Sequence, residues 1–224
     1  MPTPPPPTSW DFALDRVPDG EDLIGIGADL DVATLYEAYS IGVFPMGIGD
    51  HGGRPIGWWS PDPRGVLRPR ELVVSRSLRK SVGRFEIRVD TDFSAVVEAC
   101  AAPDRDGRWI TEDIAEAYDA MHRAGWAHSV ETWQDDVLVG GLYGVAIGGL
   151  FAGESMFHHV RDASKVALVG LCALLRADDD PRRLVDVQWQ TPHLATLGVR
   201  EVPRGEYLAA LPGVLSAPLP ACWA

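Results

Sequence analysis

The stretch with the clearest chemical content is a polar row on an otherwise apolar segment, Leu184-Val185-Asp186-Val187-Gln188-Trp189-Gln190. Side chains alternate along a strand, so we expect Asp186, Gln188 and Gln190 on one face and the apolar residues on the other. Such a pattern usually marks a strand with one solvated face. The alternative is a row of hydrogen-bonding groups inside a cleft, in which a carboxylate orients a neighbouring amide.

A glutamate and a pair of tryptophans are further candidates for a binding site. Glu154 directly follows an apolar strand and a glycine, which places its carboxylate at the end of a sheet. An exposed turn is the simpler interpretation of such a glutamate. Trp58 and Trp59 face opposite ways if they lie in a strand, so one can pack in the core while the other offers a stacking surface. Burial of both is the more common outcome.

Several kinds of site lack their sequence motifs. The chain contains no G-x-x-x-x-G-K-[S/T], H-E-x-x-H or G-x-S-x-G string. The histidines show no ligand spacing beyond one adjacent pair, and the cysteines lie far apart without a C-x-x-C pair. We therefore expect no metal site, no structural disulfide and no bound cofactor.

The charge of the chain is unevenly distributed. A formal net charge of -12 at pH 7 argues at first against a polyanionic partner. Residues 64–88 nevertheless carry eight basic residues and two acidic ones: the bases are Arg64, Arg68, Arg70, Arg76, Arg79, Lys80, Arg84 and Arg88. The planar guanidinium group fits phosphate oxygens well, so this segment is a candidate surface for nucleic acid. A solvated face that balances nearby acids is an equally good interpretation.

The order of the expected strands and helices predicts an α+β protein, in which a small N-terminal domain packs on a larger domain with a mixed sheet. The prolines of residues 1–8 indicate a disordered leader, residues 9–63 the small domain and residues 64–224 the larger one. Helical stripes are expected at Phe93–Cys100, Ile114–Met121 and Ala163–Arg176, and strands at His128–Trp133, Val137–Ile147, Leu150–Gly153 and Leu184–Gln190.

The chain shows neither a membrane span nor a signal peptide. Its apolar stretches are interrupted before they reach the roughly 20 residues of a membrane helix. The N-terminus has no basic region followed by an apolar one. We therefore expect a cytoplasmic protein with no membrane partner.

Taken together, these stretches resemble the bacterial leucyl/phenylalanyl-tRNA-protein transferase family. The resemblance runs from about residue 19 to residue 212 in the family's order and spacing. It includes Trp58 to Arg64, Arg108 to Thr111, Ala127 to Glu131, Val139 to Ala146, Phe151 to Phe157, Ala163-Ser164-Lys165, Asp186-x-Gln188 and His193. Met46, Val187 and His158 depart from the residues that are usual in the family, and these departures affect the shape of the expected pockets.

The resemblance implies an acyltransferase domain with a GNAT-like fold. It implies transfer of Leu or Phe, and less readily Met, from aminoacyl-tRNA to the N-terminal Arg or Lys of acceptor proteins, which marks them for degradation by the N-degron route. The partners would be Leu-tRNA, Phe-tRNA and those acceptor proteins, with tRNA bound by the basic segment, namely Arg64, Arg68, Arg76, Arg79, Lys80 and Arg84.

The resemblance also assigns roles within the site. The catalytic pair of the family falls on Asp186 and Gln188, and its glutamate on Glu154. The pocket for the transferred side chain would contain Leu142, Phe151, Leu171, Leu175 and Val185. Trp109 and Tyr118 match aromatic residues near the terminal adenosine of the tRNA.

Elementary chemistry agrees with this assignment. A free α-amino group has a pKa of about 7.7 to 8.0, so part of it is neutral at pH 7, and the aminoacyl ester is already activated. The carbonyl oxygen of Gln188 would accept a hydrogen bond from the attacking amine, while Asp186 would hold the amide and stabilise positive charge on nitrogen. Glu154 would pair with the basic side chain of the acceptor.

Two other functions stay open at this point. One is an acetyl-CoA-dependent N-acetyltransferase on the same fold, which the absence of an Arg/Gln-x-x-Gly-x-Gly/Ala turn disfavours. The other is a non-catalytic protein that binds basic N-termini through Glu154 and Asp186.

Overall fold

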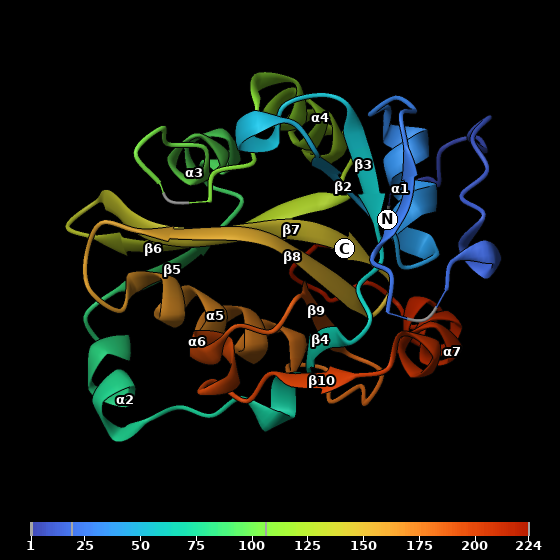
Figure 1. The fold of residues 1–224 in the computed structure, drawn as a ribbon. Helices are drawn as coiled ribbons and strands as arrows, with labels where there is room; N and C mark the ends of the chain where they lie inside the picture. Colours follow the sequence, from blue (N-terminus) through green and yellow to red (C-terminus); the bar gives the residue numbers. More distant parts are fainter. Residues whose placement is uncertain (1, 19, 106, 224) are drawn as a thin grey trace.

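The computed structural model describes residues 2–18, 20–105 and 107–223, and it contains two sheets with helices on their faces (Figure 1). The smaller sheet is built from β1 (Leu23–Ile26), β2 (Phe44–Gly47) and β3 (Ile56–Trp59) in the antiparallel order β1-β3-β2. Helix α1 (Val32–Ser40) lies beside it and buries Leu35, Ala38 and Tyr39. Short 3₁₀ turns lie at Leu14–Arg16, Asp50–Gly52 and Pro69–Glu71.

The larger sheet has the strand order β10-β4-β9-β8-β7-β6-β5. Its strands are β4 (Arg64–Leu67), β5 (Glu86–Val89), β6 (Ala127–Gln134), β7 (Val137–Ile147), β8 (Leu150–His158), β9 (Leu184–Gln188) and β10 (Arg200–Val202). β8 and β9 pair in parallel, while the other neighbours pair antiparallel. The prediction of an α+β protein with a small N-terminal sheet and a larger mixed sheet is therefore confirmed.

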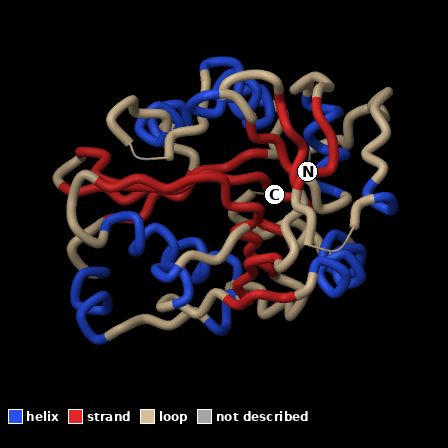
Figure 2. The backbone as a smooth tube through the Cα atoms, viewed as in Figure 1, coloured by secondary structure: helices blue, strands red, loops and turns tan. Residues whose placement is uncertain are grey.

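Helices cover both faces of the larger sheet (Figures 1 and 2). Helices α3 (Phe93–Cys100) and α4 (Glu112–Arg123) lie on one face, and α5 (Ala163–Leu175) lies on the other with α2 (Arg76–Val82) next to it. Helix α6 (Pro192–Ala195) follows β9, and α7 (Arg204–Leu215) lies at the end of the sheet near α1. Two buried apolar clusters result, one toward α3, α4 and the small sheet and one under α5.

Strongly periodic segments form the predicted elements. Helix α3 and strand β7 begin and end at the predicted residues, whereas β8 extends to His158 and β9 ends two residues early, at Gln188. Helix α2 was not predicted, because its short sequence has no apolar stripe. It begins where the Ser75 hydroxyl accepts a hydrogen bond from the N–H of Leu78. The division at residues 63 and 64 and the GNAT-like label stay predictions.

Two further sequence predictions concern the N-terminus and the membrane. Met1 of the predicted leader lies outside the described residues, and the Thr8 hydroxyl lies 2.9 Å from that of Thr34. Within the part of the chain that the structure describes, every helix is too short or too polar to cross a bilayer.

Candidate active site

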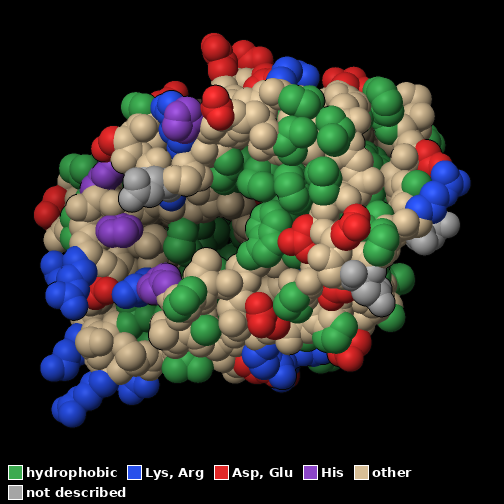
Figure 3. All heavy atoms as spheres, viewed as in Figure 1, with side chains coloured by type: hydrophobic (Ala, Val, Ile, Leu, Met, Phe, Trp, Pro, Cys, Tyr) green, Lys and Arg blue, Asp and Glu red, His purple; other side chains and the backbone are tan. Residues whose placement is uncertain are grey.

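An apolar cavity of about 130 Å³ lies where β8 and β9 stop pairing. The last parallel pairs are Phe151 with Val185 and Ala152 with Asp186. Beyond them, residues 153–156 of β8 and 187–188 of β9 line the cavity from opposite sides. Figure 3 shows a hollow with hydrophobic side chains inside it in the region of these strands. The gap that opens between β8 and β9 beyond their last pair therefore forms the cavity.

The structure brings most of the predicted pocket residues together. Leu142, Phe151, Leu171 and Val185 line the cavity, as do Glu154 and Gln188. Leu175 does not, because it lies one helical turn beyond Leu171 and lines a separate depression with Arg68 and Arg176. Sequence reasoning missed three apolar lining residues, Met156, Leu168 and Leu194, and named Val187 only as a departure that affects the shape of the pockets. Of the three, only Leu168 had a usable signal, its helical spacing of three from Leu171.

Gln188 breaks the alternation expected along β9. Its φ of 59° is left-handed, and the register between β4 and β9 shifts at the same place. The side chain of Gln188 therefore lines the cavity with Val185 and Val187, while Asp186 points elsewhere and is 0% exposed. The prediction that Asp186 and Gln188 share one face is wrong for this reason.

Asp186 is enclosed by hydrogen-bond donors. Arg64 donates to it through Nε at 2.8 Å and Nη2 at 2.6 Å, and the Tyr207 hydroxyl donates at 3.0 Å. The backbone N–H of Gln188 donates to Asp186 Oδ1 at 3.0 Å. The link between the two predicted catalytic residues thus runs through the backbone of Gln188 and not through its side-chain amide.

Arg64 belongs to this buried group and not to a phosphate-binding surface. It is 1% exposed, and its Nη1 donates to the carbonyl oxygen of Gly42 at 2.9 Å. Burial opposes the charge of Arg64, but the Asp186 carboxylate outweighs this effect and raises the pKa of the guanidinium. With its donors directed at Asp186 and Gly42, Arg64 has to be removed from the predicted tRNA-binding set.

Glu154 ends a chain of buried hydroxyl groups at the cavity wall. Tyr118 donates to Glu154 Oε2 at 2.7 Å, and the hydroxyls of Tyr39 and Tyr118 lie 2.6 Å apart. The side-chain amide of Gln188 donates to Glu154 Oε1 at 3.4 Å. Burial raises the pKa of Glu154 to about 7, although hydrogen bonds from Tyr118 and Tyr39 lower it. Since the NH₂ of Gln188 faces Glu154, its carbonyl oxygen stays available to a substrate.

The two predicted adenosine contacts lie in different environments. Tyr118 is 0% exposed, and its hydroxyl is used by Glu154 and Tyr39. Trp109 is half-buried and packs edge-on against Tyr118 with ring centroids 6.5 Å apart. Of these two residues, only Trp109 therefore presents an accessible ring. Tyr118 instead donates a hydrogen bond to Glu154.

The exposed members of the basic segment gather on and beside α2. Arg76, Arg79 and Lys80 lie on this helix, and Arg84 follows it; all four are exposed. Arg68 is also exposed but lies before the helix, next to Pro181. Figure 3 shows Lys and Arg side chains collected at the corner where Figure 1 places α2.

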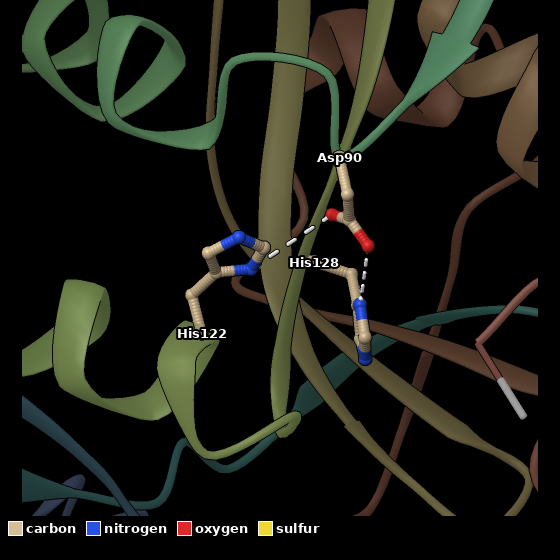
Figure 4. A group of neighbouring side chains, drawn as sticks. All are labelled: Asp90, His122 and His128. Atoms are coloured by element: carbon tan, nitrogen blue, oxygen red, sulfur yellow. Dashed lines mark hydrogen bonds and ion pairs between the residues drawn. The ribbon is translucent and has the colours of Figure 1, made fainter.

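One group of possible metal ligands exists among the described residues, at Asp90, His122 and His128 (Figure 4). His128 Nδ1 lies 2.7 Å from Asp90, and His122 Nδ1 lies 4.0 Å from it. His122 Nδ1 also lies 2.8 Å from the carbonyl oxygen of Ala127, which can only accept, so this nitrogen carries a proton. The group is held by hydrogen bonds as it stands, and the absence of a metal stays a prediction.

A Gly-x-Gly-x-x-Gly string at Gly47–Gly52 has the spacing of a dinucleotide-binding loop. It connects β2 to a short 3₁₀ turn, and no α-helix follows it. A Cβ at Gly47 would lie 1.8 Å from the carbonyl oxygen of Gly52, so close packing of the loop explains these glycines. Without a helix N-terminus, the string lacks the context of a phosphate-binding fingerprint.

Comparisons with known proteins agree with the geometry. Residues 66–212 match the family model described as leucyl/phenylalanyl-tRNA protein transferase, and residues 28–62 match the N-terminal domain of the same family. The leucyl/phenylalanyl-tRNA–protein transferase of Nitrosospira multiformis is 54% identical over 189 residues, which are 83% of this chain and 79% of that protein. The enzyme of the same name from Azotobacter vinelandii is 50% identical over 205 residues, 90% and 88% of the two chains.

A third relative extends the match along nearly the whole chain. The leucyl/phenylalanyl-tRNA–protein transferase of Cupriavidus necator is 46% identical over 222 residues, 95% of this chain and 87% of that protein. The two family models together cover β2 and β3 of the small sheet and the large sheet from residue 66 onward, including every strand that contributes to the cavity. The chain therefore belongs to the leucyl/phenylalanyl-tRNA protein transferase family of aminoacyltransferases.

Proposed function

We propose that this protein transfers a large apolar aminoacyl group from Leu-tRNA or Phe-tRNA to the N-terminal amine of an acceptor protein, with the cavity between β8 and β9 holding the transferred side chain. The observation that carries this proposal is the cavity itself. Its volume of about 130 Å³ is close to that of an engineered apolar cavity of about 150 Å³ that binds benzene. A Leu or Phe side chain matches such a space in size and polarity.

The amine of the acceptor would approach Gln188. Its carbonyl oxygen can accept a hydrogen bond from the amine and aim it at the ester carbonyl, because the NH₂ group is already bonded to Glu154. Asp186 is a positioning residue in this scheme, since it holds the left-handed Gln188 through its backbone N–H. The reaction is a direct displacement: the new amide bond forms, the ester bond to ribose breaks, and the amine proton leaves with the ribose oxygen.

Glu154 supplies a site for the basic N-terminal residue of the acceptor. Its carboxylate lies at the cavity wall beside Gln188, at the end of the hydroxyl chain from Tyr39 and Tyr118. A cationic Arg or Lys side chain there would pair with the carboxylate and stabilise its ionised form. In the cytoplasm, the product would carry a new apolar N-terminus, as the N-degron route requires.

The tRNA would lie along the basic corner of the molecule. Arg76, Arg79, Lys80 and Arg84 are exposed there, while the chain as a whole is acidic. Each phosphate contact that these cations form releases counterions, so the affinity for tRNA should fall as the salt concentration rises. Trp109 offers its ring to the terminal adenosine.

The test is transfer of radiolabelled Leu and Phe from charged tRNA to a peptide that begins with Arg. Gln188→Asn keeps a side-chain amide and tolerates the left-handed backbone. Because the Asn side chain is shorter, its carbonyl oxygen lies further from the acceptor amine, so we expect kcat to fall about a hundredfold. Leu194→Trp fills the cavity from α6 and should raise KM for both donors. Gln134→Asn, outside the cavity at the end of β6, is the matched control.

The outcomes separate the possible functions. Transfer that depends on Gln188 and on the cavity supports the proposal. If folded wild-type protein transfers neither amino acid, the donor is wrong, and acetyl-CoA is the next donor to try. Binding of Arg-starting peptides with no transfer from any donor would instead identify a non-catalytic binding protein.

A further inference from the structure

A second depression, here called the α5 depression, opens next to the cavity and has different chemistry. Its volume is about 590 Å³, and it is lined by His158, His159 and Arg161, by residues 162, 164 and 165 at the start of α5, and by His193 of α6. Five of these side chains are basic or can become cationic, and one is acidic. Figure 3 shows histidines beside Lys and Arg on this side of the hollow.

The α5 depression and the cavity share two walls. Strand β8 contributes Met156 to the cavity and His158 to the depression, roughly 7 Å further along the strand. Helix α6 contributes Leu194 to the cavity and His193 to the depression. A ligand whose apolar end fills the cavity can therefore extend from it into the α5 depression.

The first turn of α5 faces the depression without a side-chain cap. Asp162 is the N-cap residue, yet its side chain makes no capping hydrogen bond. Its Oδ2 accepts from the Ser81 hydroxyl of α2 and its Oδ1 from Lys165 at 3.4 Å. The N–H of Ala163 already donates to the carbonyl oxygen of Val160 at 3.1 Å. The next N–H groups of the first turn, those of Ser164 and Lys165, have no acceptor within the helix, and such groups favour an anion.

Two side chains within the depression also point to an anionic ligand. Ser164 is 7% exposed and lines the depression, and no hydrogen bond is formed by its hydroxyl to another described residue. His193 lies among positive charges: burial, and then Lys165 and His158, lower its pKa. A serine hydroxyl without a hydrogen-bond partner among the described residues, a nearby lysine and an uncapped helix start form the arrangement that a phosphate group would satisfy.

We propose that the α5 depression binds a phosphodiester of the donor's single-stranded 3′ end, close to the aminoacylated adenosine. Lys165 would pair with the phosphate, Ser164 and the first turn of α5 would donate to it, and His193 would close the other side. The bond between Ser81 and Asp162 joins the depression to α2, so the strand would continue from here to the exposed cations Arg76 and Lys80. The inference rests on the proposed function, because it names the donor's contact beyond the apolar cavity.

The test compares two short donors that differ in phosphate content. Leucyl-adenosine has the ester and the base but no phosphodiester, whereas leucyl-CCA trinucleotide has the same reacting end and two phosphodiesters. For each protein variant, the measured quantity is the ratio of kcat/KM with the trinucleotide to kcat/KM with the nucleoside. We expect Lys165→Ala to lower this ratio about tenfold and to lower the salt dependence with the trinucleotide.

Three further variants make the result specific. Lys165→Arg keeps the charge and should restore most of the ratio, while His193→Ala should lower it several-fold. Arg123→Ala removes an exposed cation at the end of α4, on the opposite face of the sheet, and should leave the ratio as in wild type. A ratio that is unchanged in both Lys165→Ala and His193→Ala, or a change in KM for the acceptor peptide instead, overturns the inference.

Failure of the proposed function is a distinguishable result. If wild type transfers from neither short donor nor charged tRNA, the binding of fluorescein-labelled CCA RNA is measured directly by anisotropy. Weaker binding by Lys165→Ala than by Arg123→Ala would support the phosphate site even then. Equal binding by these two variants would refute it.

Discussion

Removing the guanidinium of Arg64 should destabilise the fold far more than removing an exposed arginine. Arg64 and Asp186 are each 1% exposed at their side chains and form two hydrogen bonds, 2.8 and 2.6 Å long. In Arg64→Met, Asp186 would keep only the donors of Tyr207 and Gln188, as a buried carboxylate with no cation. Breaking one partner of such a pair costs about 3 to 5 kcal/mol.

The assay is urea unfolding at pH 7, followed by tryptophan fluorescence. We expect the transition midpoint of Arg64→Met and of Asp186→Asn to fall strongly with little change in the slope, which means a loss of stability. The double variant should be less destabilised than the sum of the two single variants, because it leaves neither charge unpaired. Transfer activity of Arg64→Met should fall as well, because the carboxylate of Asp186 that bonds to the N–H of Gln188 would lose the two guanidinium hydrogen bonds that fix its position.

The matched control is Arg182→Met. Arg182 also forms a forked pair with a carboxylate, with Nη2 at 2.6 Å from Asp180, but its side chain is 43% exposed. Exposed pairs contribute about 0 to 1 kcal/mol, so this variant should stay near wild type. If Arg64→Met loses less than about 1 kcal/mol, or if the double variant loses the full sum, the account of a buried, coupled pair is refuted.

Three other predictions concern protonation, packing and the cavity. The pKa of Glu154 is raised from 4.5 to about 7, so its proton stabilises the fold fully below pH 4.5 and this stabilisation is lost as pH rises through 7. Over that range the free energy of unfolding of wild type should fall by about 3 kcal/mol relative to that of Glu154→Gln. If urea unfolding gives the same difference between the two proteins at both pH values, the raised pKa of Glu154 is contradicted. Gly144→Ala places a Cβ 2.2 Å from the carbonyl oxygen of Ala152 and should lower Tm sharply, whereas Gly83→Ala, with no atom within 4 Å, should not. Leu142→Ala enlarges the cavity, and it should raise KM for Leu-tRNA more than for Phe-tRNA; equal changes would remove this residue from side-chain recognition.

The parts of the fold that the sequence predicts are those with strong local patterns. The apolar stripe of α3 and the long apolar run of β7 depend on nearest neighbours along the chain, and both begin and end as expected. Helix α2 depends on a single capping hydroxyl at Ser75 and was missed. Local rules thus locate elements that carry their own hydrophobic face and miss those that contact the core at one or two residues.

The candidate site shows a different limit. The family resemblance assigned half of the residues that line the cavity, and the structure brings them together, but the roles within the site depend on backbone detail. The left-handed backbone of Gln188 moves its side chain away from the face of Asp186. The alternation of side chains along a regular strand cannot predict such a residue. Arg64 looked like one more base in a basic segment, because charge counts carry no information on burial. Its carboxylate partner is 122 residues away, so only the tertiary structure shows the pair.

The bonds between the small and the large sheet have a consequence for how the chain can be divided. Arg64 of the large sheet donates to Gly42, the Tyr39 hydroxyl of α1 meets Tyr118 of α4, and the indole of Trp189 donates to Asp22 at 2.9 Å. Arg64 is linked to Gln188 through Asp186, and Tyr39 is linked to Glu154 through Tyr118. A fragment that starts at residue 64 would therefore lose part of the scaffold around its own reaction centre. We therefore expect truncation to the large sheet alone to impair the reaction centre, so the two segments should be engineered together.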